Sequence, residues 1–247
     1  MKRFRWHIYM SLLLVAFSIA AYFVQIEVFH RTEDTIFYMM QDVAFVPIQV
    51  LLVTLILNQL LISREKQILL KKLNMLIGTF HIELGSRLIE LCTQFSADSE
   101  GVRSRLMVGP KWSAKDFRDA AAFASTADPG IDSRRSDLNA LKVFLESKRA
   151  FLLSLLANPN LLEHEAFTDL LWAVFHLAEE LSARKGFEGL PRVDYDHLSG
   201  DIKRAYIQLL VQWLFYMQHL KGDYPYLFSL AVRMNPLDPD ADAVVKE

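Results

Sequence analysis

Uncharged, mainly hydrophobic residues fill two long stretches near the start of the chain. Residues 8–26 and residues 43–63 contain no Asp, Glu, Lys or Arg. An α-helix needs about 20 mainly apolar residues to cross a hydrocarbon layer about 30 Å thick, and inside lipid the backbone must satisfy its own hydrogen bonds. The pattern therefore predicts two transmembrane helices over these residues. The alternative is a pair of helices buried in a soluble protein.

The charges that flank the two stretches predict their orientation. Residues 1–7 are basic, residues 27–42 carry an excess of acidic side chains, and residues 64–72 are basic again. Basic residues favour the cytoplasmic side of a membrane. We therefore expect a basic cytoplasmic N-terminus at residues 1–7, a short external connection at residues 27–42, and both termini of a multi-pass protein in the cytoplasm.

Two details leave alternatives open in this part of the chain. Ser18-Ile19-Ala20 is similar to a signal-peptide cleavage site, but apolar residues continue to Val24, which favours an uncleaved span. Pro47 is accommodated as a kink inside the second span, or it is the first residue of that span. In the second case residues 36–46 form a separate interfacial helix.

The segment YFVQIEVFHRTEDTIFYMMQDVAFVPIQVLLVTLILNQLL, residues 22–61, resembles an uncharacterised family of prokaryotic two-span membrane proteins. The resemblance covers the membrane part of the chain and the start of the helix that follows. It implies a location in the prokaryotic plasma (inner) membrane. It implies no assigned activity, and therefore no catalytic residue.

A regular apolar repeat follows the second stretch and predicts a long helix over residues 64–96. Its apolar positions recur at helical spacing: Leu69, Leu73, Leu76, Phe80, Leu84, Leu88, Leu91 and Phe95. Two interpretations are open. The helix is either a free stalk that dimerises as a coiled coil, or the first helix of a bundle. Gly78 and Gly85 permit close helix contact in both cases.

The remaining residues predict further helices and no strand. Ser113 and Asp116 form a helix-start pattern, with Trp112 placed to contact Phe117. Helix-stop and helix-start signals then predict helices over residues 133–157, 160–185, 196–222 and 223–234. The fold class is therefore all-α: two transmembrane helices, a long helix, and a cytoplasmic helical domain at residues 97–234. The acidic tail at residues 235–247 is expected to be disordered.

Composition and charge exclude several classes of protein. The chain holds 27 Lys and Arg against 29 Asp and Glu, a net charge of −2, so it lacks the basic footprint of a nucleic-acid-binding protein. Its one cysteine, Cys92, excludes an internal disulfide and a four-cysteine metal site. Phosphate-binding loops, nucleophile elbows and zinc-protease motifs do not occur in the sequence.

A few chemically capable residues stand out, and a structural interpretation is preferred for each of them. Helical spacing places Glu27, His30 and Asp34 on one face, where they form a weak metal site or a solvated acidic loop. One predicted helix is crowded with titratable groups: His164, Glu165, Asp169, His176, Glu179 and Glu180. Asp194 and His197 form a second acid–histidine pair, and Cys92 is expected to be a buried, inert thiol. The sequence therefore predicts no catalytic, cofactor-binding or metal-binding residue and no cofactor.

One basic segment contains Arg103, Arg105, Lys111, Lys115 and Arg118. It either contacts anionic lipid headgroups or is a solvated surface, and the solvated surface is preferred.

The function that these patterns favour is a membrane tether. The lipid bilayer is its expected partner, and a homo-oligomer or a protein partner is expected to bind through the long helix. Two alternatives belong to other classes: a regulatory switch that couples the spans to the cytoplasmic helices, and a metal- or lipid-dependent enzyme.

Overall fold

The computed structural model describes residues 2–161 and 164–245, and these residues confirm the all-α fold class. They form α-helices and one π-helical turn, and their only bridge of β type is an isolated pair between Ser96 and Ile131. The chain divides into two compact units, Met1–Lys66 and Gln67–Glu247. Below, these are called the N-terminal unit and the helical domain.

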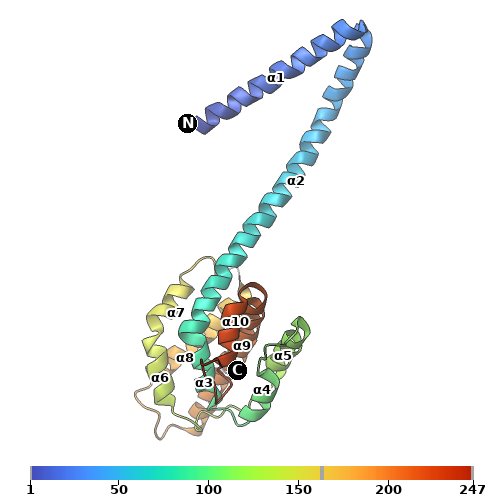
Figure 1. Cartoon of the computed structure of the whole chain (residues 1–247). Helices are drawn as coiled ribbons and strands as arrows, with labels where there is room; N and C mark the ends of the chain where they lie inside the picture. Colours follow the sequence, from blue (N-terminus) through green and yellow to red (C-terminus); the bar gives the residue numbers. More distant parts are fainter. Residues whose placement is uncertain (1, 162–163, 246–247) are drawn as a thin grey trace. The chain divides into compact units, whose positions relative to one another are not determined.

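Two helices build the N-terminal unit, and the turn between them is short. Helix α1 covers Lys2–Phe29 and helix α2 begins at Thr32, within its full range Thr32–Phe80 (Figure 1). The segment predicted as the external connection, residues 27–42, is therefore mainly helical, and within it only residues 30 and 31 lie outside a helix. His30 makes the turn with a positive φ of 53°, and Glu33 and Asp34 lie in the first turn of α2, where acidic groups favour a helix start.

Pro47 lies inside helix α2, so the separate interfacial helix over residues 36–46 is wrong. Both helices of the N-terminal unit meet the length and composition of a membrane-crossing segment, by these two criteria alone. The segments that qualify are Tyr9–Phe29 and Thr32–Thr93, and none of the side chains in their most apolar windows is buried.

The helical domain begins within α2 and contains all the other helical segments of the described chain (Figure 1). In chain order these are the π-helical turn η1 (His81–Gly85), α3 (Ser86–Thr93), α4 (Ser99–Leu106), α5 (Ala114–Thr126), α6 (Leu138–Ser147), α7 (Arg149–Leu156), α8 (Glu165–Ala183), α9 (Arg192–Asp223) and α10 (Pro225–Arg233). Helix α9 is central, because it packs against α3, α5, α8 and α10. Tyr206 and Trp213 of α9 are among the largest fully buried side chains.

The long helix after the second apolar stretch belongs to the bundle. Most of its predicted apolar positions lie in the core of the helical domain: Leu73, Phe80, Leu84, Leu88, Leu91 and Phe95 are buried, while Leu69 and Leu76 pack against that core. A free stalk would leave these side chains in water, so the structure decides between the two interpretations in favour of the bundle. The π-helical turn at His81–Gly85 interrupts the helix and was not expected.

Local signals located some helix ends and missed others. The start at Ser113 is confirmed as a capping box with Asp116, and the rings of Trp112 and Phe117 lie 5.2 Å apart. The single helix over residues 133–157 is wrong, because α6 begins after Asp137 and a break at Lys148 separates it from α7.

Three further expected boundaries need correction. Helix α8 starts after His164 instead of at residue 160, and α9 starts at Arg192 instead of Asp196. Disorder from residue 235 onward is also wrong for the first tail residues, because Asn235 and Leu237 are buried. Leu237 fills an apolar site, and this burial offsets the entropy lost by ordering the segment. The last two tail residues, 246–247, lie outside the described residues.

Candidate functional site

Helices α8 and α9 bring four titratable side chains together on facing surfaces. His176 and Glu180 lie four residues apart on α8, and His197 and Asp201 lie four residues apart on α9. Residues at this spacing project from the same face of a helix. Because α8 and α9 pack against each other, the two pairs meet in one histidine–carboxylate cluster.

Asp201 is the centre of this cluster. Its Oδ2 atom lies 3.5 Å from Nε2 of His176 and 3.3 Å from Nε2 of His197. Glu180 lies beside the same two rings, with carboxylate–Nε2 distances of 4.0 Å to His176 and 3.5 Å to His197. The Asp201 side chain is 2% exposed, whereas the two imidazoles are about half exposed. The cluster is therefore open to solvent on its histidine side and closed around the aspartate.

Two arginines border the cluster, and both are matched by carboxylates. Arg184 donates to both carboxylate oxygens of Asp194, at 2.7 and 3.0 Å, and to Glu180 at 2.8 Å. These hydrogen bonds hold the pKa of Asp194 and that of Glu180 below their ordinary values, and they raise the pKa of Arg184. Arg204 lies 3.1 Å from Oδ1 of Asp201. Asp201 is thus held in place through one oxygen.

In metal-ligand terms, His176, His197 and Asp201 form a compact set. Their ligand atoms all lie within 4.8 Å of one another. Imidazole and carboxylate ligands together suit divalent first-row transition metals. The sequence pattern singles out His176, Glu180, Asp194 and His197, but not Asp201. The signal that could have found it is the repeated spacing His-x-x-x-Glu on one helix and His-x-x-x-Asp on the next.

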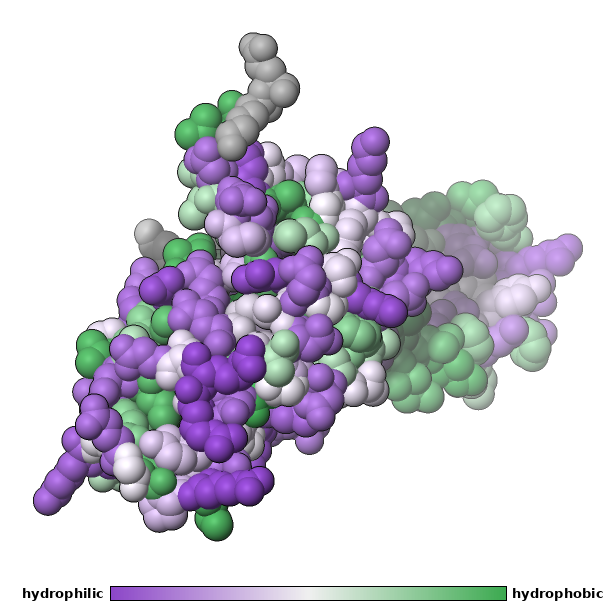
Figure 2. Space-filling model, turned by 90° about the horizontal axis from the view of Figure 1, so that it is seen from below, coloured by the Kyte–Doolittle hydropathy of each residue, from purple (hydrophilic) through white to green (hydrophobic). Residues whose placement is uncertain are grey.

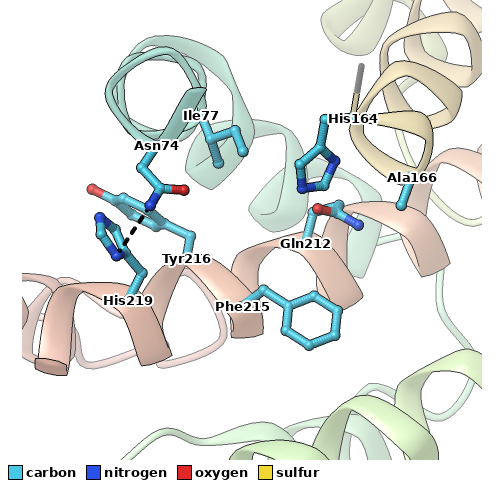
Figure 3. A pocket seen from close by; sticks show the side chains of 8 residues that line it. All are labelled: Asn74, Ile77, His164, Ala166, Gln212, Phe215, Tyr216 and His219. Carbon is cyan, nitrogen blue, oxygen red and sulfur yellow. Dashed lines mark hydrogen bonds between the residues drawn. The ribbon is translucent and has the colours of Figure 1, made fainter. Parts of the chain in front are cut away.

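A second feature of the helical domain is a pocket of about 330 Å³ between α2, α8 and α9 (Figure 3). Asn74 and His219 meet at its side, with 3.3 Å between Nδ2 and Nδ1. The Nδ1 atom of His219 also lies 2.7 Å from Asp223. His164 points toward the same space as Gln212 in Figure 3, and its Nδ1 accepts the backbone N–H of Phe167. Asn74, His164 and His219 therefore each have a partner, whereas no side-chain hydrogen bond to Gln212 or Tyr216 occurs among the described residues.

An apolar groove of about 730 Å³ borders this pocket along α2, α9 and α10. Its exposed lining includes Leu70, Met75, Ile82 and Leu227. Elsewhere the face of the helical domain seen in Figure 2 is mainly hydrophilic. The groove therefore combines this exposed apolar surface with polar side chains, among them Asn74, His219 and Asp223.

His81 occupies an unusual position in the π-helical turn. Its ring is fully buried and stacks on Tyr216, with 4.9 Å between centroids. Neither ring nitrogen has a hydrogen-bond partner among the described residues, although the Gln212 backbone is nearby. Burial lowers the pKa of His81 to about 3, so the ring is neutral at physiological pH. A side chain at Gly85 would place its Cβ 2.6 Å from Nδ1 of His81, so the close packing depends on that glycine.

The other candidate residues have structural surroundings. Cys92 is fully buried, and burial raises the pKa of its thiol to about 12, as expected of an inert thiol. The predicted face of Glu27, His30 and Asp34 is wrong, because His30 lies in the turn that separates α1 from α2. Glu179 pairs with Arg149.

In the basic segment, the Arg105 guanidinium lies over the Phe123 ring, 5.0 Å from its centroid. Its neighbours Lys111, Lys115 and Arg118 are exposed. This exposure is compatible with both interpretations of the segment, a solvated surface and a contact with lipid headgroups.

Comparison with known proteins identifies the family. One family model, described as the MJ1433 N-terminal helical domain, matches residues 2–61, and another, described as the C-terminal helical domain of the uncharacterized protein MJ1433, matches residues 69–233. The uncharacterized protein MJ1433 of Methanocaldococcus jannaschii is 42% identical over 234 residues, which cover 95% of this chain and 94% of the relative. The chain belongs to the MJ1433 family. No solved structure matches it.

Membership of the MJ1433 family confirms the coarser part of the sequence-based resemblance. The family is uncharacterised, it has two helical domains, and no activity is assigned to it. The two family models meet between residues 61 and 69, where the two compact units also meet. The membrane arrangement goes beyond these findings and is taken up next.

Proposed function

We propose that this MJ1433-family protein is an integral membrane protein that tethers its helical domain to the cytoplasmic face of a prokaryotic plasma membrane. The observation that carries the proposal is the surface of the N-terminal unit. Its large apolar side chains are exposed, including Phe17 at 72%, Phe23 at 73% and Leu55 at 57%. Exposing apolar surface to water costs about 25 cal/mol per Å². A bilayer removes this cost without requiring a protein partner for either helix.

The flanking charges support the orientation of the tether. Lys2, Arg3 and Arg5 precede the first apolar stretch, while the acidic residues Glu33 and Asp34 begin helix α2. The positive-inside rule then puts both ends of the chain in the cytoplasm. The hydroxyl of Tyr22 donates to Asp42 at 3.0 Å, which suits an aromatic residue at the outer headgroup level.

The proposal includes a homo-oligomer or a protein partner, but the fold restricts which surface of the long helix can bind it. The apolar repeat of the long helix is already used by the core of the helical domain, because Phe80, Leu84 and Leu88 are fully buried. We therefore expect a second copy or another protein to bind through a surface other than this buried repeat. Native mass spectrometry of the detergent-extracted protein tests for the homo-oligomer, and a strictly monomeric spectrum would contradict it.

Membrane integration is tested by alkaline carbonate extraction of membranes from cells that express the full chain. We expect the protein to stay in the membrane pellet. Leu13→Arg combined with Leu55→Arg places one arginine in each span and is expected to release the protein, because each arginine near the centre of a span costs about 2.5–3.5 kcal/mol. Leu13→Val combined with Leu55→Val is the matched control and is expected to stay in the pellet. Release of the unaltered protein would refute the proposal.

Orientation is tested by cysteine labelling in a Cys92→Ala background. Thr32 and Ala243 are both exposed and lie at the two positions that the proposal assigns to opposite sides of the membrane. A membrane-impermeant maleimide is expected to label Thr32→Cys in intact cells and Ala243→Cys only after lysis. The reverse pattern would show the opposite orientation.

A further inference from the structure

We propose that His176, His197 and Asp201 bind a divalent first-row transition-metal ion, of which Zn²⁺ is the representative. The ligand atoms are Nε2 of the two histidines and Oδ2 of the aspartate. Glu180 lies beside both rings, next to the ion. The proposal concerns the helical domain alone and does not depend on the membrane assignment.

The distances between the ligand atoms fit a shared ion. Zn²⁺ binds imidazole nitrogen and carboxylate oxygen at about 2.0–2.2 Å, and tetrahedral geometry then separates two neighbouring ligand atoms by about 3.4 Å. Oδ2 of Asp201 lies 3.5 Å from Nε2 of His176 and 3.3 Å from Nε2 of His197. These two separations match the value that an ion bound by Asp201 and by each histidine requires, and all the ligand atoms of the set lie within 4.8 Å of one another.

The buried carboxylate oxygen of Asp201 is a second, independent observation that indicates a bound ligand. Its Oδ2 atom is buried and has no hydrogen-bond partner among the described residues. A buried polar atom left without a partner costs about 1–3 kcal/mol, and more when it is charged. The same oxygen is directed at the two Nε2 atoms, which in neutral imidazoles with a proton on Nδ1 carry a lone pair each. A cation at this point supplies the missing partner of all three atoms.

The groups around the three ligands allow an ion to enter from solvent and hold the Asp201 carboxylate in a fixed orientation. His176 and His197 are 45% and 50% exposed, so an ion can enter from solvent and keep a water molecule as a further ligand. Arg204 contacts the other oxygen of Asp201 at 3.1 Å, an outer contact of the kind that orients metal-binding carboxylates. The second nearby cation, Arg184, is matched by Glu180 and Asp194. The local positive charges are therefore compensated.

The test is a Zn²⁺ titration of the full-length protein, purified without a histidine tag in detergent and stripped of metal with EDTA. We expect isothermal titration calorimetry to give one Zn²⁺ per chain. His176→Gln and His197→Gln are each expected to weaken binding at least 100-fold, and Asp201→Asn at least 10-fold. The histidine variants change half-exposed side chains and keep the fold testable if Asp201→Asn does not fold.

His219→Ala is the matched control, because His219 and Asp223 form another histidine–aspartate pair four residues apart on α9. We expect this variant to bind Zn²⁺ like the unaltered protein. Co²⁺ in place of Zn²⁺ is expected to give visible absorption bands that disappear in His197→Gln. Absence of stoichiometric binding, or equal binding by the histidine variants, would overturn the proposal and leave the cluster as an ion-pair network between α8 and α9.

Discussion

The protonation and the conformation of His81 depend on the side chains packed around it. The sequence places it within an apolar helical repeat, where a histidine at the surface would be ordinary. In the structure it lies in a π-helical turn, and its ring stacks on that of Tyr216. The ring also occupies the space that a side chain at position 85 would need, which is free because residue 85 is glycine. π-Helical turns are rare and are often found at functional sites. Its two unpartnered nitrogens make it a polar group held in the core at a cost in stability.

We expect His81→Leu to stabilise the helical domain at pH 7 by about 1–3 kcal/mol, because it removes a buried polar group without a partner. The pKa of His81 is lowered to about 3 in the folded chain, so between about pH 6.5 and 3 the unfolded chain binds one more proton at this residue. Stability therefore falls with decreasing pH by about 1.4 kcal/mol per pH unit, and His81→Leu should lack this contribution.

Thermal unfolding followed by circular dichroism over this pH range measures both effects of His81→Leu. His30→Asn changes an exposed histidine at a position of positive φ and serves as the control with an unchanged pH slope. A pH slope in His81→Leu equal to that of the unaltered protein would show that folding does not lower the pKa of His81.

At the scale of elements, helix starts were predictable where the partners are neighbours in sequence. The capping box of Ser113 and Asp116 is local, so its residues reveal it directly. Ser133 is also a predicted helix start, but the residue three positions on is Ser136, so no capping box forms there. Its hydroxyl donates to the Tyr195 carbonyl and its N–H donates to Ser199, both on α9. Helix α6 is instead capped by Asp137.

We expect Asp137→Ala to lower the free energy of unfolding by about 0.5–2 kcal/mol. The carboxylate of Asp137 accepts the backbone N–H groups of Asn139 and Ala140 at 2.8 and 3.1 Å, and alanine leaves both without a partner. Asp137→Asn keeps a capping oxygen and is expected to cost only a few tenths of a kcal/mol. Chemical denaturation of the three proteins tests the expectation. Equal loss in both variants would attribute the effect to charge, and no loss in either would show that the cap is not needed.

At the scale of the whole molecule, the buried core is confined to one of the two units. The buried hydrophobic side chains begin at Leu73 and end at Leu237, so among the described residues the helical domain holds the apolar core. The N-terminal unit contributes exposed apolar surface instead. This division agrees with the separate family matches to residues 2–61 and 69–233.

We expect a chain of residues 67–247 to fold in aqueous buffer without detergent. Its core is complete without residues 1–66, because every buried hydrophobic residue lies beyond Leu69. Size-exclusion chromatography should give a compact species, and circular dichroism should show one cooperative thermal transition. A chain of the same residues with Leu84→Asp is the control that should not fold, since Leu84 is fully buried. Aggregation of both chains alike would show that the helical domain needs the N-terminal unit.

Residues a few positions apart are enough to predict the helical class, the two apolar stretches and most apolar positions of the long helix. Three features depended on tertiary structure. The apolar side chains between Leu73 and Phe95 belong to the core of the helical domain, and not to a free stalk, because α9 and its neighbours cover them. The π-helical turn required packing around His81 and Gly85. The cluster of His176, His197 and Asp201 required two helices to face each other. Local patterns specify which side of a helix is apolar, but only packing selects the surface that covers it and the polar groups that meet across it.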